Sequence, residues 1–244
     1  MVALACGLQS QGFDPHVYSL APEPPAGQRL LLETLRQAEI DVSFVNVKHT
    51  WQALAAVRRL RSMLQVQQPH LVQSFLFHAN AISALAARRL NVPVVAGLRV
   101  AQREQLRAFI ERRLAHRIDA FVCVSQSVAK VAETVGRLPA SKLQVIPNGV
   151  DPERFSDVTA ADLSTYEIAA DKKVIFFVGR LDHQKGVDVL LSAMAGVFAQ
   201  RKDTILLIIG EGPVRSDLQQ QVEHLQLSHY VVFLPWQENP LPFI

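Results

Sequence analysis

The sequence predicts an α/β protein with two parallel sheets, and three observations lead to this prediction. Short apolar runs that suit buried strands alternate with amphipathic helices along almost all of the 244 residues. Polar and glycine-rich motifs follow directly after several of these strands, where ligands bind in open parallel sheets. The alternation breaks between Asp151 and Lys173, in a stretch rich in Asp, Ser and Thr. We therefore expect two domains, 1–150 and 172–244, joined by a connection over 151–171.

The first domain should begin with a short helix that ends near Gly12. Six strands are predicted, at His16–Leu20, Val42–Val47, Leu71–Phe75, Val92–Gly97, Ala120–Val124 and Leu143–Ile146. Five helices are predicted between them, at Arg29–Ala38, Trp51–Gln67, Ala79–Leu90, Arg103–His116 and Ser127–Val135. Strands that alternate with helices in this way predict a parallel sheet with helices on both faces.

The second domain repeats the alternation on a smaller scale. Its three expected strands are Val174–Val178, Thr204–Ile209 and Tyr230–Leu234. A helix should start after Gly186, and apolar residues at helical spacing predict another helix around Leu218 and Val222. Three strands make a small sheet with exposed edges, so we expect this domain to be incomplete.

The segment VIFFVGRLDHQKG, residues 174–186, carries the clearest chemical signal. A buried strand stops at Gly179, two cations follow at Arg180 and Lys185, and Gly186 opens a helix. Glycine allows a close backbone approach, and a helix start offers free N–H groups with partial positive charge. This combination suits a diphosphate, although a plain turn with two solvated cations has the same spacing.

A second tight turn, Gly210-Glu211-Gly212, follows the next strand of this domain. It could lie beside a bound ligand. Alternatively, the glycines only make the turn, and Glu211 is a solvated carboxylate near a helix start.

Three motifs in order, IPNGVDPERF, VGRLDHQKGVDVLL and IIGEGPVRSDL, resemble the family-4 retaining glycosyltransferases. Segments of the first half, such as FHANAISALAARRLNVPVVAGLRVAQRE and DAFVCVSQSVA, look like acceptor-domain segments of that family. The resemblance covers nearly the whole chain. It implies the GT-B fold, in which two Rossmann-like domains flank a cleft.

The resemblance also implies an activity, which is transfer of a sugar from a nucleotide diphosphate sugar, with retention, to a polysaccharide or glycolipid precursor. Arg180 and Lys185 would grip the diphosphate and stabilise the charge that grows on the leaving group. Gly179, Gly186, Gly210, Glu211 and Gly212 would complete the donor site. No cofactor is implied, and no cluster of Asp, His or Cys in the sequence suggests a metal site.

Several polar residues of the first domain are further candidates. His78, which we count among the catalytic candidates, and Asn80 follow a strand and open a helix, but His78 could instead cap that helix. Arg99 stands where many members carry a histidine, and either an acceptor phosphate or a structural ion pair could be its partner. Ser125 is expected to be an N-cap, and Asn148 to shape a turn. Trp236, after the last strand, could stack on a base or pack in the domain.

The chain departs from the family pattern at both ends, so we expect a fragment. The glycine-rich loop that normally precedes the first helix and the segment with two paired glutamates are not seen in the sequence. A non-catalytic nucleotide-binding or interaction module is therefore the alternative to an active enzyme. The ordered motifs argue against a third possibility, a sugar-nucleotide epimerase of the same fold.

Charge is unevenly divided between the two halves. Residues 1–150 hold 17 Lys and Arg against 9 Asp and Glu, whereas residues 151–244 hold 8 against 13. Much of the basic excess comes from Arg58, Arg59, Arg61, Arg88, Arg89 and the run from Arg103 to Arg117. These cations could be solvated helix faces, or a surface that contacts an anionic membrane or a phosphorylated acceptor.

Location and partner class follow from the remaining composition. Cys6 and Cys123 lie in apolar segments, which suggests reduced thiols in a cytoplasmic protein. No apolar run is long enough to span a membrane, so any membrane contact should be peripheral, at the inner face of the plasma membrane. Nucleic-acid binding is not expected, because no interleaved aromatics or known module is visible.

Overall fold

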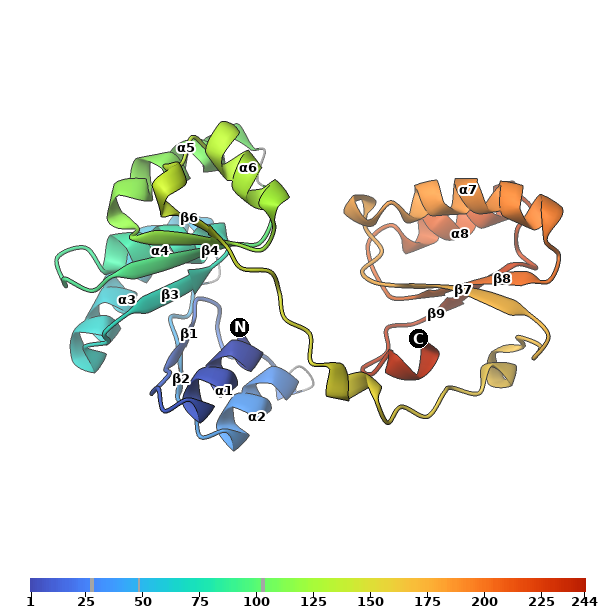
Figure 1. Cartoon of the computed structure of the whole chain (residues 1–244), viewed down its shortest axis with the longest axis horizontal. Coiled ribbons are helices and arrows are strands. Elements are labelled where there is room, and N and C mark those ends of the chain that lie inside the picture. Colours follow the sequence, from blue (N-terminus) through green and yellow to red (C-terminus); the bar gives the residue numbers. More distant parts are fainter. Residues whose placement is uncertain (27–28, 48, 102–103) are drawn as a thin grey trace. The chain divides into compact units, whose positions relative to one another are not determined.

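The computed structural model describes residues 1–26, 29–47, 49–101 and 104–244. The chain forms two compact units, Met1–Gly149 and Val150–Ile244, which are drawn in Figure 1. Both units are α/β, and every strand pair in them is parallel. The predicted fold class is therefore confirmed.

The first unit opens with a small layer of two helices and two strands. These are α1 (Val2–Ser10), β1 (Val17–Ser19), α2 (Leu30–Gln37) and β2 (Val42–Phe44). The two strands pair only with each other among the described residues, and Ala5, Val17, Leu35 and Ile40 form the local core.

The larger sheet of this unit has four strands in the order β3-β4-β5-β6. Its strands are β3 (Val72–Phe75), β4 (Val94–Leu98), β5 (Ala120–Cys123) and β6 (Leu143–Val145). Helices α3 (Ala53–Gln67), α4 (Phe77–Ala86), α5 (Gln105–Leu114) and α6 (Gln126–Thr134) connect and cover them, as Figure 1 shows. Parallel strands need such crossovers, because a short hairpin cannot join them.

Helix α4 is central to this unit because it packs on two cores. Ala84 joins the core of β4 and β5, while Ile82 and Ala86 join that of α3. The buried amide of Asn80 accepts a hydrogen bond from the Ser74 hydroxyl at 2.8 Å and donates to the Gly97 carbonyl at 3.2 Å. Asn80 thus ties α4 to the ends of β3 and β4, which is a structural role.

The predicted bounds of α4 were wrong at both ends. The helix begins at Phe77, directly after Leu76, which has a φ of 72°. It ends at Ala86, and the chain then turns through Arg89 and Asn91, both with positive φ. For the next helix, the predicted start at Arg103 lies outside the described residues, and a 3-10 turn, η3 (Ala115–Arg117), continues α5.

The second unit has a three-stranded sheet in the order β7-β8-β9. The strands are β7 (Lys173–Val178), β8 (Thr204–Ile209) and β9 (Val231–Leu234), joined by α7 (Val187–Gln200) and α8 (Arg215–His224). All six residues of β8 are buried, because its two faces enter two different cores. Leu206 and Ile208 pack under α7 and α8, whereas Ile205, Leu207 and Ile209 pack on the opposite face.

That opposite face is covered by short segments (Figure 1). Ile168, which follows the 3-10 turn η6 (Leu163–Tyr166), is buried there, and Tyr166 packs against Phe243. The Ala161 amide donates to the Pro242 carbonyl at 2.7 Å. Part of the stretch 151–171 is therefore packed on the sheet.

Cys6 and Cys123 are free cysteines in this structure, and Cys123 is buried. Burial raises the pKa of the Cys123 thiol, which keeps it protonated and unreactive. Among the described helices, none combines the length and the apolar character that crossing a membrane would require.

Candidate functional site

The loop after β7, residues 179–186, is folded by its own side chains and is called the first loop here. Leu181 is fully buried and anchors its centre. Asp182 caps the 3-10 turn η7 (His183–Lys185) by accepting a hydrogen bond from the Gln184 amide at 3.0 Å. Gly186 then turns the chain into α7. Its φ of 64° is a left-handed conformation that favours glycine.

The loop after β8, residues 210–214, lies directly against the first loop and is called the second loop. The Leu181 amide donates to the Glu211 carbonyl at 2.9 Å, and the Val214 amide donates to the Leu181 carbonyl at 3.3 Å. A Cβ at Gly210 would lie 2.0 Å from the Gly179 carbonyl oxygen, and one at Gly212 would lie 2.0 Å from that of Leu181. Gly210 and Gly212 are therefore needed for contact between the loops, and not only for the turn of the second loop.

Arg180 and Lys185 are both exposed at the surface of the first loop. The Arg180 Nε donates to Asp182 Oδ2 at 2.6 Å, and a terminal guanidinium nitrogen pairs with the same oxygen. Arg180 remains 69% exposed while Asp182 is 13% exposed, so the carboxylate is fixed and the cation faces solvent. The Lys185 ammonium group has no hydrogen-bond or ion-pair partner within the described part of the chain.

The sequence analysis missed Arg215, the first residue of α8. Its guanidinium donates to the Gly210 carbonyl at 2.8 Å, to Glu211 Oε1 at 2.9 Å and to the Leu234 carbonyl at 3.3 Å. Arg215 thus ties the second loop to the end of β9. The available signal was the Glu-to-Arg spacing of four residues, which is typical of a helical ion pair. Glu211 is accordingly a paired carboxylate, although its side chain is still 52% exposed.

The start of α7 adds a further attraction for anions. No side chain caps the first turn of this 14-residue helix, so its free N–H groups stay available. Asp188 lies in that first turn and partly opposes the attraction. At the same edge of the sheet, Trp236 follows β9 and is 65% exposed, so it has an open aromatic face. Two cations, a helix start and an aromatic ring on one unit can hold a phosphorylated ligand.

In the first unit, the candidates lie after the carboxyl ends of neighbouring strands. His78 is exposed near the start of α4, and its ring meets that of Phe77 edge-on at 5.2 Å. No side chain caps α4, so His78 is not its cap. Arg99, after β4, donates to the Asn148 amide oxygen at 2.8 Å, which makes its partner neutral rather than an acid.

One further expectation can be compared with the structure. The N-cap prediction for Ser125 is confirmed, because its hydroxyl accepts from the Val128 amide at 3.2 Å. Within residues 1–26, 29–47, 49–101 and 104–244, no three His, Cys, Asp or Glu side chains gather as metal ligands would.

Family models match both units of the chain. The model for Glycosyltransferase Family 4 matches residues 1–154, and that for Glycosyl transferases group 1 matches residues 160–242.

Curated relatives match about half of the chain. An uncharacterized glycosyltransferase of Methanocaldococcus jannaschii is 34% identical over 122 residues, which is 46% of this chain and 30% of that protein. A GDP-mannose-dependent phosphatidylinositol monomannoside mannosyltransferase of Mycolicibacterium smegmatis is 32% identical over 136 residues, covering 53% of this chain and 35% of that protein. The chain thus aligns with about a third of the length of these relatives.

Solved structures support the fold over a longer stretch. HepE of Anabaena, in complex with UDP and glucose, has a TM-score of 0.79 at 18% identity and covers 99% of this chain and 66% of its own. WaaG, a glycosyltransferase involved in lipopolysaccharide biosynthesis, has a TM-score of 0.66 at 15% identity, with 98% and 66% coverage. At such identities the likeness concerns the fold alone, which is GT-B. Because one family model spans more than half of its residues, this chain belongs to Glycosyltransferase Family 4.

Proposed function

We propose that this chain is the part of a glycosyltransferase that binds a nucleotide diphosphate sugar and transfers its sugar to an acceptor. One observation carries the proposal. Two glycine loops at the carboxyl edge of β7 and β8 are hydrogen-bonded to each other and present Arg180 and Lys185 near the start of α7. Gly179, Gly186, Gly210, Glu211 and Gly212 build this donor site.

The proposed chemistry needs what these loops offer. When the bond between sugar and phosphate breaks, the nucleoside diphosphate leaves with additional negative charge. Cations that are already in place stabilise that charge more in the transition state than in the ground state. We propose that Arg180 and Lys185 perform this role without a metal ion or cofactor, and that transfer proceeds with retention.

The remaining assignments belong to the same proposal. Residues 172–244 would hold the donor, residues 1–150 would hold the acceptor with His78 near the reacting sugar, and 151–171 would connect them. Solved neighbours hold UDP, and a curated relative is named for GDP-mannose, so the loops are compatible with either base. We propose a sugar or lipid-linked acceptor of the cell envelope, reached from the cytoplasm, with peripheral contact to an anionic membrane.

A titration calorimetry experiment on the chain tests the donor site. UDP and GDP should bind, while uridine and guanosine should bind far more weakly, because the loops act on phosphates. Arg180→Ala and Lys185→Ala should each weaken diphosphate binding by roughly tenfold or more, since each removes a charge-assisted contact.

The matched control is His183→Ala, because His183 is an exposed residue of the same turn whose side chain has no hydrogen-bond or ion-pair partner among the described residues. Asp182 is unsuitable as a control, since it both caps the turn and pairs with Arg180. If His183→Ala weakens binding as much as the two cation variants, or if none of the three changes it, the donor-site assignment is wrong. A sugar-transfer assay separates an enzyme from a module that only binds the nucleotide.

A further inference from the structure

A basic pocket opens at the amino ends of β4 and β5, at the sheet edge opposite to His78 and Arg99. It has a volume of about 440 Å³. Its lining includes Arg88 and Arg89 from the turn after α4, Arg117 from η3, and Asn91, Val94 and Asp119 at the strand starts. None of these residues belongs to the donor loops, so the proposed function leaves this pocket unexplained.

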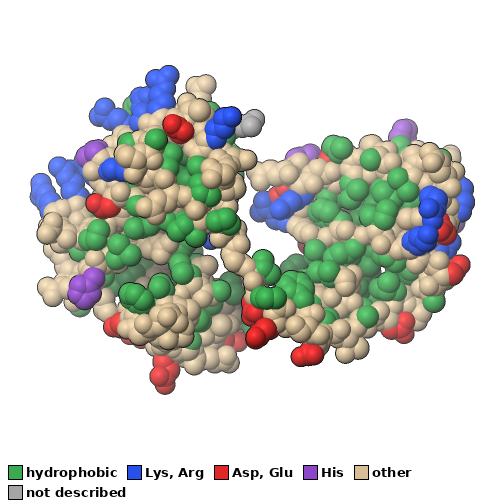
Figure 2. Space-filling view, in the orientation of Figure 1, with side chains coloured by type: hydrophobic (Ala, Val, Ile, Leu, Met, Phe, Trp, Pro, Cys, Tyr) green, Lys and Arg blue, Asp and Glu red, His purple; other side chains and the backbone are tan. Residues whose placement is uncertain are grey.

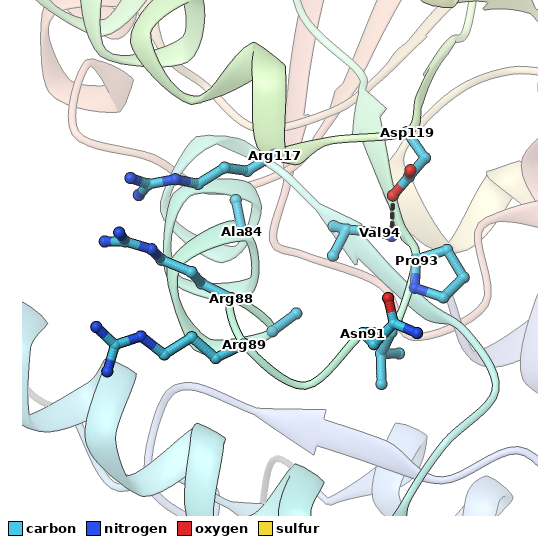
Figure 3. Close-up of a pocket in the computed structure, with 10 residues that line it drawn as sticks. Ala84, Arg88, Arg89, Asn91, Pro93, Val94, Arg117 and Asp119 are labelled. Atoms are coloured by element: carbon cyan, nitrogen blue, oxygen red, sulfur yellow. Dashed lines mark hydrogen bonds between the residues drawn. The ribbon is translucent and has the colours of Figure 1, made fainter.

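The three arginines that line this pocket carry their side chains next to one another. In Figure 3, the side chains of Arg88, Arg89 and Arg117 run in nearly the same direction and end in one column. Asp119 is the acidic lining residue, and its carboxylate turns to the backbone, where it accepts from the Val94 amide at 2.8 Å. The three cations therefore outnumber the acid, and the acid is engaged elsewhere.

Several other arginines of the first unit bind backbone carbonyls or a carboxylate, which the three that line the pocket do not. Arg59 donates to the Val45 carbonyl at 3.1 Å, Arg61 donates to the Leu85 and Ala86 carbonyls at the end of α4, and Arg107 pairs with Glu104. Within the described residues, the guanidinium groups of Arg88 and Arg89 have no hydrogen-bond or ion-pair partner. Arg117 Nε meets only the neighbouring ring nitrogen of His116, at 3.1 Å.

The backbone beneath these side chains is strained. Arg89 has a φ of 77°, a conformation that costs free energy for any residue with a Cβ and is uncommon for a long side chain. Such outliers persist where the surrounding structure needs them, often at ligand sites. The negative end of α4 attracts cations in general, but Arg61 already occupies its last carbonyls. Neither helix charge nor relaxed geometry therefore accounts for three adjacent guanidinium groups.

We propose that Arg88, Arg89 and Arg117 form a binding site for a phosphate group. Guanidinium forks match phosphate oxygens bidentately, and a dianion offsets the mutual repulsion of the three cations. A second cavity of about 520 Å³ adjoins at Arg117 and is lined by Arg112, Arg113, Leu114 and His116. Figure 2 shows that Lys and Arg side chains gather in several groups on the surface of this unit. The site accepts either a soluble phosphate or the phosphate of a lipid headgroup.

Calorimetric titration with inorganic pyrophosphate tests the site, using Arg180→Ala in every protein to weaken binding at the donor loops. Adding Arg88→Gln and Arg117→Gln should weaken the remaining binding by at least tenfold. The charge-matched control is the pair Arg58→Gln and Arg137→Gln, because both residues are exposed and neither guanidinium group has a hydrogen-bond or ion-pair partner among the described residues. It should change the affinity less than twofold. Equal losses in both proteins, or no pyrophosphate binding outside the donor loops, would overturn the proposal.

A second measurement does not depend on the folding of the double variant. When pyrophosphate is added to the chain with Arg180→Ala alone, the NMR signals of the Asn91, Val94 and Asp119 backbone amides should shift. Shifts confined to residues 179–214 would overturn the proposal. Sedimentation with vesicles of phosphatidylcholine, with and without phosphatidic acid, identifies the source of the phosphate. If pyrophosphate displaces the chain from the acidic vesicles, the headgroup is the ligand; if the chain binds pyrophosphate but not these vesicles, the ligand is soluble.

Discussion

The contact between the first and second loops can be tested through Gly210. In Gly210→Ala, the new Cβ would lie 2.0 Å from the Gly179 carbonyl oxygen, which belongs to the backbone and cannot rotate away. Gly210 also has a φ of 151°, a conformation that residues with a Cβ rarely adopt. The substitution should therefore force the second loop away from the first.

The expected loss can be estimated from these two contributions. Backbone strain of this kind costs about 1–3 kcal/mol. Overpacking of a well-packed contact costs about another 1–3 kcal/mol. Together they predict that the free energy of unfolding of the second unit falls by roughly 4 kcal/mol, which corresponds to about three orders of magnitude in the unfolding equilibrium.

Amide hydrogen exchange at β8 measures this effect in the second unit alone, because the strand lies between both of its cores. Protection of residues 204–209 should fall by about 10²–10³ in Gly210→Ala. Gly196→Ala is the matched control, since Gly196 lies in α7 and a Cβ there meets no atom within 4 Å. It should stabilise the unit by about 1 kcal/mol, as alanine does in a helix. Protection in Gly210→Ala within threefold of the original chain would refute the close approach of the loops.

Three further predictions follow from single side chains. Asp182→Asn keeps an oxygen that can cap η7 but removes a negative charge beside Arg180. UDP should therefore bind about three- to tenfold more tightly in low salt. If calorimetry shows weaker binding instead, Asp182 is a residue that positions Arg180. Arg215→Gln removes donors from the Gly210 and Leu234 carbonyls and should lower the free energy of unfolding of the second unit by about 1–3 kcal/mol; unchanged exchange at β8 would contradict this. Burial raises the pKa of Glu111 from 4.5 to about 7 in the folded chain, against an opposing effect of the Arg107 charge. As pH rises, the unfolded chain therefore loses this proton at a lower pH than the folded chain does. The first unit should therefore lose stability, on the order of 3 kcal/mol, between these two pH values. Urea unfolding of Glu111→Gln should lack that loss, and parallel pH profiles would contradict the assignment.

The fold could be predicted well because each strand is a short apolar run. The six buried residues of β8 and the glycines after β7 and β8 stand out in the sequence, and the structure places them as expected. The bounds of α4 could not be predicted, because Leu76 and Arg89 adopt positive φ without being residue types that favour it. The packing of α4 on two cores fixes its position in the fold, and this tertiary information is not visible in the sequence.

Single residues of the site were harder to predict than its loops. The spacing of Arg180 and Lys185 indicates an anion site, but not that Asp182 would hold Arg180. Asn80 looks like a cleft residue in the sequence, yet its amide is buried between β3 and β4. The role of Arg215 could not be predicted from the sequence, because its acceptors are the backbone carbonyls of Gly210 and Leu234, which come together only in the folded sheet. The roles of Arg180, Lys185 and His78 in transfer stay predictions.

The most direct test of the donor site is a map of backbone amide shifts on adding UDP or GDP to this chain. We expect the largest amide shifts at Gly179–Gly186, at Gly210–Gly212 and in the first turn of α7. The nucleoside alone should cause much smaller amide shifts at these residues. The same two loops should stay unshifted when Arg180→Ala and Lys185→Ala are combined. A diphosphate that binds but shifts only amides outside these loops would contradict the central claim.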